Sequence, residues 1–321
     1  MWVRLLLLLF LAGVEAESTQ PPPAIDAAAI SNPNQQPVSS GANGAAVVRA
    51  QILLARAHFS CGAIDGHFGS NLEKTVTAYQ NDRHLPASGA VDAATWTSLN
   101  ADHAPVLMPY TITGDDEKGP FIQIPKDMMK QAELPAMNYS SPLEELAEHF
   151  HAAPQLLQEL NPGADFGKVG QQLTVPNAIT MPPGEAAEIH VSKSESSVRA
   201  IAADGKLLAF YVATIGSEHD PLPIGNWKVQ WIKRNPHFHY DARLFWDAKK
   251  PEQKADIKPG PNNPVGVVWI DLSKEHYGIH GTPDASLVGH ATSHGCIRLT
   301  NWDASELAGM VKPGTPAILQ E

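Results

Sequence analysis

One cysteine and two histidines lie close together near the C-terminal end of the chain. His280 begins the sequence His-Gly-Thr, and Cys296 ends the sequence Ser-His-Gly-Cys, which contains His294. A thiol attacks a carbonyl carbon only as the thiolate, and free cysteine, with a pKa of about 8.5, is little ionised near neutral pH. A base must therefore lie beside Cys296, and both histidines are candidates. The pattern predicts acyl transfer through a cysteine nucleophile.

The residues around Cys296 fit the same chemistry. Gly295 leaves the backbone bare next to the sulfur, so the amides of Gly295 and Cys296 can point at a developing oxyanion. Arg298 adds a positive charge, which suits a substrate carboxylate or lowers the pKa of the thiol. A small buried cysteine without a chemical role is the ordinary alternative. It is disfavoured because a packed core gains nothing from so many polar groups together.

Three blocks of the C-terminal part resemble the L,D-transpeptidase catalytic domain of the YkuD family. They are Gly-Pro-Asn-Asn-Pro-Val-Gly at 260–266, Tyr-Gly-Ile-His-Gly-Thr at 277–282 and Ser-His-Gly-Cys-Ile-Arg-Leu-Thr-Asn-Trp-Asp at 293–303. The resemblance implies that Cys296 is the nucleophile and His280 its general base. It also implies that the turn at His294 and Gly295 contributes to the oxyanion site. The choice of His280 over His294 comes from the family, because the spacing alone leaves both open.

Four further residues of these blocks are predicted to surround the substrate: Arg298, Ser293, Thr282 and Asn301. Arg298 suits a carboxylate of a peptide stem, and a structural ion pair with Asp303 or Glu306 is the alternative. Ser293 and Asn301 are expected to hold the loop rather than to touch the substrate.

The resemblance implies an exported enzyme that acts on the peptide stems of peptidoglycan. The thiolate attacks the carbonyl before the terminal D-Ala of a tetrapeptide stem, and D-Ala leaves. An amine of a neighbouring stem then resolves the thioester, which cross-links the wall. The alternatives are an L,D-carboxypeptidase that hydrolyses the same stems and a wall-binding protein without catalytic activity. The sequence leaves the acceptor open among diaminopimelate, lysine, a free D-amino acid, a lipoprotein and water.

Composition and the N-terminal segment limit the partners and the location. The chain has 321 residues and a formal net charge of −11, which argues against nucleic acid and an anionic membrane surface as partners. Residues 1–16 carry one basic residue, an apolar run and a Val-Glu-Ala site, which predicts a signal peptide cleaved after Ala16. A permanent anchor is the alternative, although the run is short for a membrane span. We expect a monomer in the bacterial periplasm or cell wall, without membrane contact after cleavage.

Neither a disulfide nor a metal site is expected. Cys61 and Cys296 are the two cysteines of the chain, and a bond between them would block the proposed nucleophile. We therefore expect two free thiols, with Cys61 buried in a core. His237 and His239 stand two residues apart, but no acidic or thiol partner follows at ligand spacing. No cofactor is expected.

Three segments are expected before the middle of the chain. Residues 17–44 are rich in Pro, Ala, Ser, Gln and Asn without an apolar stripe, which predicts a disordered linker. Residues 45–102 contain three helical stretches and the turn Ile-Asp-Gly-His-Phe-Gly at 64–69, and they resemble the three-helix peptidoglycan-binding domain. A generic three-helix bundle is the alternative. Residues 103–137 are interpreted as a connector with a strand candidate at 110–113.

Residues 138–180 are expected to form a small α+β module. Two helices begin after Ser141 and near Pro154, and a strand follows at 173–176. The order resembles a LysM module, which binds chains of N-acetylglucosamine. Its opening Ser-Ser-Pro-Leu departs from the Gly-Asp-Thr-Leu of that family, so a spacing role is the alternative.

Residues 185–321 are β in character and form the expected catalytic domain. Short strands recur, and Asp204-Gly205 between two of them is a hairpin signal. A mainly antiparallel β sandwich is predicted, and the family implies the same. Residues 235–263 carry aromatic side chains among charges and prolines, and we interpret them as a lid or wall of the substrate cleft.

Overall fold

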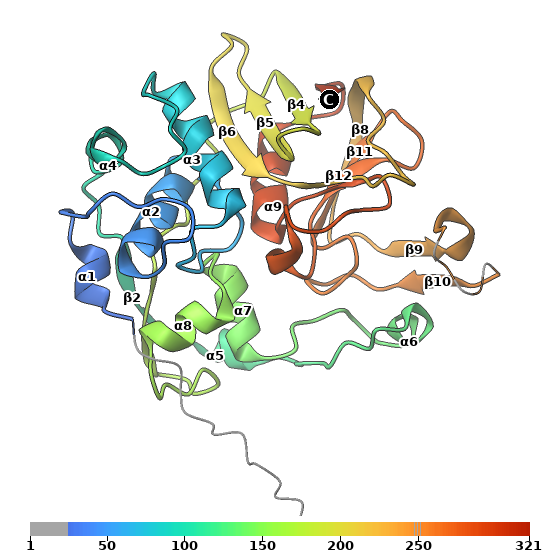
Figure 1. The fold of residues 1–321 in the computed structure, drawn as a ribbon. Helices are drawn as coiled ribbons and strands as arrows, with labels where there is room; N and C mark the ends of the chain where they lie inside the picture. The colour runs from blue at the N-terminus through green and yellow to red at the C-terminus, as the bar shows by residue number, and fades with distance from the viewer. Residues whose placement is uncertain (1–24, 247, 249, 251) are drawn as a thin grey trace, which may run out of the picture.

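The computed structural model describes residues 25–246, 248, 250 and 252–321. The predicted signal peptide at 1–16 lies outside these residues. Within them, no helix combines the length and the apolar character that a membrane span requires. Figure 1 shows the helical N-terminal part beside a large sheet that is formed mainly by the C-terminal part.

The N-terminal part is helical. Its helices are α1 (Ala27–Ser31), α2 (Ala45–Arg56), α3 (Ser70–Asp82) and α4 (Ala93–Leu99). The last three agree with the three predicted helical stretches. Asp92 caps α4 by accepting a hydrogen bond from the Thr95 amide at 2.8 Å. The predicted turn before α3 is held by Gln51 of α2, whose side-chain oxygen accepts from the amides of Asp65 and Gly66.

The prediction of a disordered linker is wrong for residues 25–44. Ile30 of α1 is fully buried in the N-terminal core. Arg49 of α2 donates a hydrogen bond to the Ser31 carbonyl at 3.2 Å, and the Trp96 indole donates to the Gln36 carbonyl at 3.1 Å. The segment has too few apolar residues to show a periodic pattern, and it is ordered because the later helices supply its partners.

The middle of the chain forms a strand, two helices and a strand. Its elements are β2 (Leu107–Thr111), α7 (Pro142–His149), α8 (Pro154–Leu160) and β3 (Gln172–Pro176), and β2 pairs antiparallel with β3. The two helices lie where they were predicted, but the first strand comes from the expected connector. The segment between β2 and α7 contains α5 (Gly114–Glu117) and α6 (Met128–Ala132), and α6 contacts β10 (Lys254–Ile257) of the catalytic part (Figure 1).

The catalytic part is built on one ten-stranded sheet. In spatial order its strands are β1 (Phe59–Ser60), β6 (Leu207–Val212), β5 (Ser197–Ile201), β4 (Glu188–Ser192), β14 (Pro316–Gln320), β8 (Gly225–Arg234), β11 (Val268–Leu272), β12 (Gly278–His280), β13 (Ile297–Arg298) and β7 (Thr214–Ile215). The pairs β1–β6, β4–β14 and β12–β13 are parallel and the others are antiparallel. The sheet is therefore mainly antiparallel, as predicted.

Strand β8 joins two halves of this sheet. Its first residues pair with β14 and its later residues pair with β11. The sandwich was predicted as packed sheets, whereas the structure forms both halves from one continuous sheet because the long β8 belongs to each of them. Helix α9 (Asn301–Met310) contacts β11 and β12 and contributes four buried residues to the core of this part: Ala304, Leu307, Ala308 and Met310.

The N-terminal and catalytic parts are joined by direct contacts. β1 of the N-terminal part adds a parallel strand to the edge strand β6. Phe59 of β1 packs against Tyr79 of α3 and Phe210 of β6, with ring centroids 5.3 and 6.3 Å apart. The Asn71 side-chain amide donates to the Val288 carbonyl, in the loop before Cys296, at 2.8 Å.

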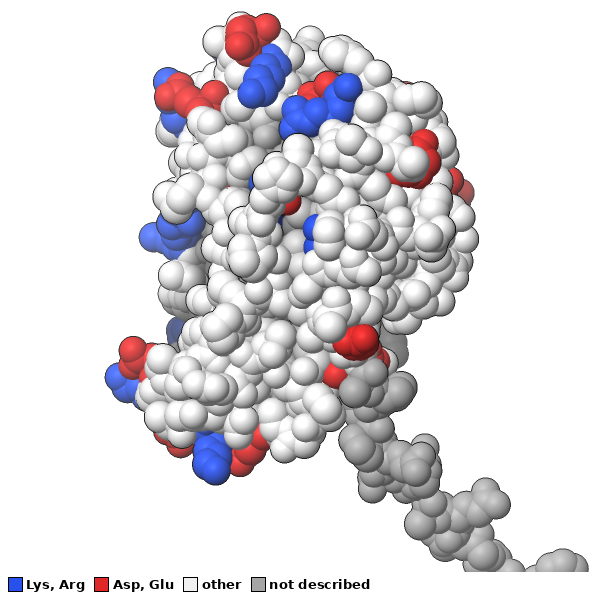
Figure 2. Space-filling model, turned by 90° about the vertical axis from the view of Figure 1, so that its left-hand side faces the viewer, with Lys and Arg blue, Asp and Glu red and all other residues white. Residues whose placement is uncertain are grey.

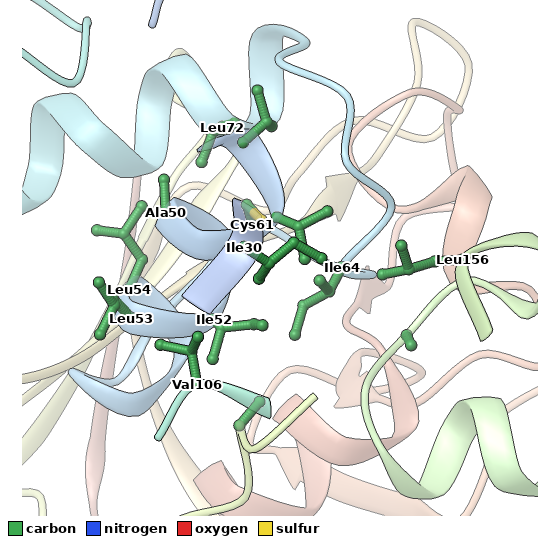
Figure 3. Packing of buried hydrophobic residues seen from close by; sticks show 14 of the residues in the cluster. Ile30, Ala50, Ile52, Leu53, Leu54, Cys61, Ile64, Leu72, Val106 and Leu156 are labelled. Atoms are coloured by element: carbon green, nitrogen blue, oxygen red, sulfur yellow. The ribbon is translucent and has the colours of Figure 1, made fainter. Parts of the chain in front are cut away.

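One hydrophobic cluster connects the N-terminal helices with the middle of the chain. Figure 3 shows Cys61 among apolar side chains of α2 and α3, with Leu156 of α8 close by. Cys61 is buried and both cysteines are free thiols, as predicted.

Figure 2 shows one face of the molecule, on which acidic and basic side chains are scattered in small mixed groups. This face has no continuous basic patch.

Buried carboxylic acids of α9 face the N-terminal part. Ser60 of β1 donates a hydrogen bond to Asp303 at 2.9 Å, and His58 Nδ1 lies 2.7 Å from a carboxylate oxygen of Glu306. Burial raises the pKa of Asp303 to about 8, although hydrogen bonds from Thr300 and Ser60 oppose the shift. The folded protein therefore keeps a proton on Asp303 that the unfolded chain releases.

The substitution Asp303→Asn should weaken the pH dependence of stability. Between the ordinary aspartate pKa of about 3.9 and the raised one, the folded state binds more protons than the unfolded state. The free energy of unfolding then falls as the pH rises, by up to about 1.4 kcal/mol per pH unit for this group. Asparagine keeps an acceptor for Ser60 and has no such proton.

The free energy of unfolding can be measured by urea denaturation at about pH 5 and about pH 7. Between these pH values we expect it to fall less in Asp303→Asn than in the wild type, by roughly 1 kcal/mol per pH unit. The exposed residue Asp115 provides the control Asp115→Asn, which should leave the decline unchanged. Equal declines in the wild type and in Asp303→Asn would contradict the assignment.

Candidate active site

The parallel pair β12–β13 brings the two histidine and cysteine blocks together. Ile279 lies opposite Ile297, and His280 lies opposite Arg298. Cys296 directly precedes β13, and its thiol lies near the backbone of Gly278 and the charge of Arg298. Gly278, two residues before His280, makes room for Trp269, because a Cβ at this position would lie 2.6 Å from a ring carbon of the indole.

His280 is held as a neutral base. The side chain is 3 % exposed, and its ring stacks on Trp269 of β11 with centroids 5.3 Å apart and planes inclined by 14°. Nδ1 lies 2.6 Å from the Gly281 carbonyl oxygen, which can only accept, so Nδ1 carries the proton and Nε2 keeps a lone pair. Burial lowers the pKa of His280 to about 3, and the positive charge of Arg298 acts in the same direction.

Cys296 is also neutral before reaction. Burial raises the pKa of its thiol, while a backbone hydrogen bond at Gly278 and the charge of Arg298 oppose the shift. The sulfur lies 3.7 Å from the carbonyl oxygen of His276. Since the imidazole resists a proton and the thiol keeps one, the resting pair is thiol and imidazole rather than thiolate and imidazolium.

The turn before the thiol has a fixed shape. Gly295 has φ at 99°, and a Cβ at this position would lie 2.7 Å from a ring carbon of Tyr277, so both the conformation and the space require glycine. The Ser293 hydroxyl donates to the Cys296 carbonyl at 2.6 Å, and the Ser293 amide donates to the Gly216 carbonyl at 3.0 Å. These two bonds fix the position of Ser293 in the loop.

The two histidines have different surroundings. His280 lies in β12, opposite the strand that Cys296 directly precedes. The His294 ring packs instead against Phe245 and Trp246 of the insertion, with centroids 4.9 and 6.2 Å away. The insertion contains an antiparallel pair, β9 (Phe238–Asp241) and β10 (Lys254–Ile257). The short 3-10 helix Ala242–Leu244 lies between these two strands. Its contact with His294 places it as a wall beside the turn that carries the thiol.

Arg298 is a largely buried cation that has no counterion in the described part of the chain. Its Nε is buried and has no hydrogen-bond partner, and no ion pair to its guanidinium exists among the residues that the structure describes. The alternative of an ion pair with Asp303 or Glu306 is wrong, because these side chains bond to residues of the N-terminal part instead. An unpaired buried charge is costly, so the site is suited to an anionic ligand group.

Thr282, just after β12, and Asn301 are the remaining predicted residues. Thr282 is 9 % exposed, and Asn301 is 2 % exposed at the start of α9. The Asn301 side chain bonds only to protein groups among those described, accepting from the Val267 amide at 3.1 Å. These bonds tie Asn301 to the surrounding backbone and to Glu148.

Two aromatic residues of the site were not predicted. Trp269 is found only once the register of β11 against β12 is known, because nothing in its sequence neighbourhood marks it as a partner of His280. Tyr277 directly precedes the block that contains His280, and its role in supporting Gly295 depends on a contact across the loop.

The pair His237 and His239 does have an acidic neighbour. Asp256 of β10 lies across the hairpin, and its carboxylate oxygens are 3.1 Å from Nδ1 of each histidine. Sequence spacing does not reveal this neighbour, because strand pairing brings Asp256 beside the two histidines. Even so, no group of three candidate ligand side chains in the described part of the chain is arranged to hold a metal ion.

Comparisons with known proteins agree on the class. The family model for the L,D-transpeptidase catalytic domain, YkuD, matches residues 186–319, and that for the peptidoglycan binding domain matches residues 43–99. The L,D-transpeptidase relative YkuD of Bacillus licheniformis is 33% identical over 175 residues, which are 54% of this chain and 90% of the relative. The relative ErfK/SrfK of Escherichia coli is 30% identical over 183 residues, 55% of this chain and 58% of the relative.

A solved L,D-transpeptidase structure from Xylanimonas cellulosilytica, comprising residues 123-326, aligns with 90% of this chain and 99% of that chain, at 16% identity and a TM-score of 0.38. The sequence matches define an L,D-transpeptidase catalytic domain that follows a peptidoglycan-binding domain. The chain belongs to the YkuD family of L,D-transpeptidases. It is an L,D-transpeptidase enzyme, and peptidoglycan is its partner.

Iodoacetamide should alkylate Cys296 slowly near neutral pH. Because burial raises the pKa of the thiol above its usual range, the thiolate fraction is small there and increases about tenfold per pH unit below that pKa. We expect the alkylation rate, followed by mass spectrometry in a Cys61→Ala background, to keep rising above about pH 8.5. A rate that is already constant at neutral pH would reveal a resting thiolate and contradict the neutral pair.

Proposed function

We propose that this enzyme is exported and forms cross-links through a thioester on Cys296. The observation that carries the proposal is that His280 lies opposite Arg298 in the pair β12–β13, while Cys296 directly precedes β13 and has its thiol near the same Arg298. The L,D-transpeptidase class supplies the reaction, and this arrangement supplies a nucleophile, a base and an anchor for a carboxylate. The chain acts as a monomer in the periplasm or cell wall.

In the first half-reaction the thiol attacks the carbonyl carbon that joins the third residue of a tetrapeptide stem to its terminal D-Ala. As the S–C bond forms, the thiol proton moves to Nε2 of His280, and the backbone amides of Gly295 and Cys296 stabilise the oxyanion. Collapse of the tetrahedral intermediate breaks the C–N bond. The leaving amine of D-Ala takes the proton from His280, and a thioester remains.

In the second half-reaction an amine of a neighbouring stem attacks the thioester carbonyl. His280 takes a proton from the attacking amine and returns one to the departing sulfur, so that an amide and the free thiol result. Water in place of the amine would give hydrolysis, the reaction of a carboxypeptidase. The packing of Phe245 and Trp246 against His294 supports the insertion as the wall that shapes the acceptor side.

Arg298 is the anchor for a stem carboxylate. A buried, unpaired guanidinium gains a charge-assisted hydrogen bond when a carboxylate enters the site. The same pairing would reduce the electrostatic effect by which Arg298 lowers the pKa of His280. Substrate binding would then make His280 a stronger base at the moment when the base is needed.

The other parts of the chain deliver this site to the wall. The N-terminal domain binds peptidoglycan, and the unit formed by β2, α7, α8 and β3 has the strand and helix order of a LysM module. We interpret this unit as LysM-like, with glycan contact as its proposed role.

Intact-protein mass spectrometry would test the thioester. Incubation with a disaccharide-tetrapeptide should add to the wild type the mass of the substrate minus D-Ala. The adduct should be absent from Cys296→Ala and present in the control Cys61→Ala, which removes the other thiol. Folded wild-type protein with a free thiol and no adduct would overturn the proposed nucleophile, whereas an adduct in Cys296→Ala would assign it elsewhere.

The substitution Arg298→Gln should impair recognition of a stem carboxylate. Hydrogen bonds to charged groups contribute about 1.5–3 kcal/mol, which corresponds to a loss in kcat/KM of roughly tenfold to a hundredfold. Stems with free and with amidated carboxyl groups should be compared in the wild type and the variant. Amidation should cost activity in the wild type and little in Arg298→Gln. The exposed Arg234 provides the control Arg234→Gln, and an equal cost of amidation in all three proteins would contradict the proposed anchor.

A further inference from the structure

Asn301 connects three segments at the catalytic end of the sheet. Its Oδ1 accepts a hydrogen bond from the Val267 amide at 3.1 Å, and its Nδ2 donates to the Pro261 carbonyl at 3.1 Å. Nδ2 also donates to the carboxylate of Glu148, at 2.9 and 3.1 Å to the two oxygens. All hydrogens of the amide are thus used, and its orientation is defined.

The backbone just after β12 and the backbone of the loop before β11 lie directly against this amide. A Cβ added to Gly266 or to Gly281 would collide with Oδ1 of Asn301. The two glycines therefore form a cradle that fits the oxygen and excludes any larger residue. Since Gly281 immediately follows His280, the position of Oδ1 limits where the end of β12 can lie.

Gly281 in turn determines the state of His280. Its carbonyl oxygen lies 2.6 Å from Nδ1 of His280 and accepts a hydrogen bond from the Nδ1–H group. Nε2 is therefore left as the basic nitrogen. A shift of the Gly281 peptide would loosen this bond and release the ring to the other tautomer. The orientation of Asn301 is therefore linked to the base through one backbone carbonyl.

Glu148 decides how Asn301 is oriented. A carboxylate only accepts hydrogen bonds, so it faces Nδ2 and turns Oδ1 toward Gly281. Tyr139 donates a second bond to the carboxylate at 3.0 Å. Burial raises the pKa of Glu148 to about 7, and the bonds from Asn301 and Tyr139 act against the shift and favour the ionised form.

Glu148 comes from outside the catalytic domain, on α7 of the middle unit. A second contact holds the same helix in place, because the side-chain amide of Asn262 donates to Glu144 at 2.7 Å and to the Asn138 carbonyl at 3.0 Å. The loop before β11 and the start of α9 are therefore both tied to α7.

We propose that Glu148 is a positioning residue for transpeptidation, which fixes the amide of Asn301 and through Gly281 holds His280 in its reactive tautomer. The inference deepens the proposed function, because it rests on His280 as the base. It makes the middle unit a part of the active site in addition to any role in glycan contact.

The test uses the full-length enzyme with a tetrapeptide stem and an amine acceptor. Glu148→Ala should lower kcat and the single-turnover rate of thioester formation by about tenfold to a hundredfold, because small displacements of catalytic groups have effects of this size. KM should stay within about twofold, since Glu148 bonds to Asn301 and Tyr139 and is proposed to act through Asn301 rather than on the substrate. Glu148→Gln keeps an acceptor for Asn301 and should retain most of the activity.

Nitrogen NMR of His280 provides a readout that a purely structural role would not move. The wild type should show the Nδ1–H tautomer, and Glu148→Ala should show a mixture. Glu145→Ala removes a carboxylate from the same helix and should change neither the tautomer nor kcat. If Glu148→Ala does not fold, Glu148→Asp, which withdraws the carboxylate by one methylene, should show the same effects at smaller size.

The outcomes separate this inference from the proposed function. Activity that survives in Cys296→Ala or His280→Ala would overturn the proposed mechanism and this inference with it. If both variants are inactive while Glu148→Ala keeps its kcat and its tautomer, only the positioning role of Glu148 is overturned. Equal losses in Glu148→Ala, Glu148→Gln and Glu145→Ala would also overturn it, since they would show a general effect on α7.

Discussion

The parallel ladder between β12 and β13 is the constraint on which the active site depends. His280 and Cys296 are distant in sequence, and they come together because Ile279, which precedes His280, lies opposite Ile297, which follows Cys296. A slip of one residue would turn His280 to the other face of the sheet. The chain secures the register on both sides, with β11 pairing along β12 and β7 pairing along β13.

Burial gives this site its chemical character. The base and the nucleophile are both neutral at rest, because a charged imidazole or thiolate would lose its hydration. Arg298 is the exception, since a guanidinium stays charged even when it is buried. The protein thus keeps one permanent charge beside a neutral pair, and charge separation in that pair is deferred until a substrate occupies the site.

Local signals in the sequence located the chemistry and much of the helical structure. The blocks around His280 and Cys296, the Asp92 cap, and the helices that begin at Pro142 and Pro154 depend on neighbours in the chain and could be predicted. The order of residues 25–44, the pairing of β2 with β3 and the link from Glu148 to Asn301 depend on partners far away in sequence. Such contacts leave no periodic pattern, so they become visible only in the folded chain.

The pairing of β1 with β6 has a consequence for how the enzyme meets the wall. Together with the bond from Asn71 to Val288, it joins the peptidoglycan-binding domain directly to the catalytic sheet and to the loop before Cys296. For the proposed thioester mechanism, the place where the first domain binds the polymer then limits how far along it the thiol can reach. The spacing between binding and reaction depends on the fold rather than on the length of a tether.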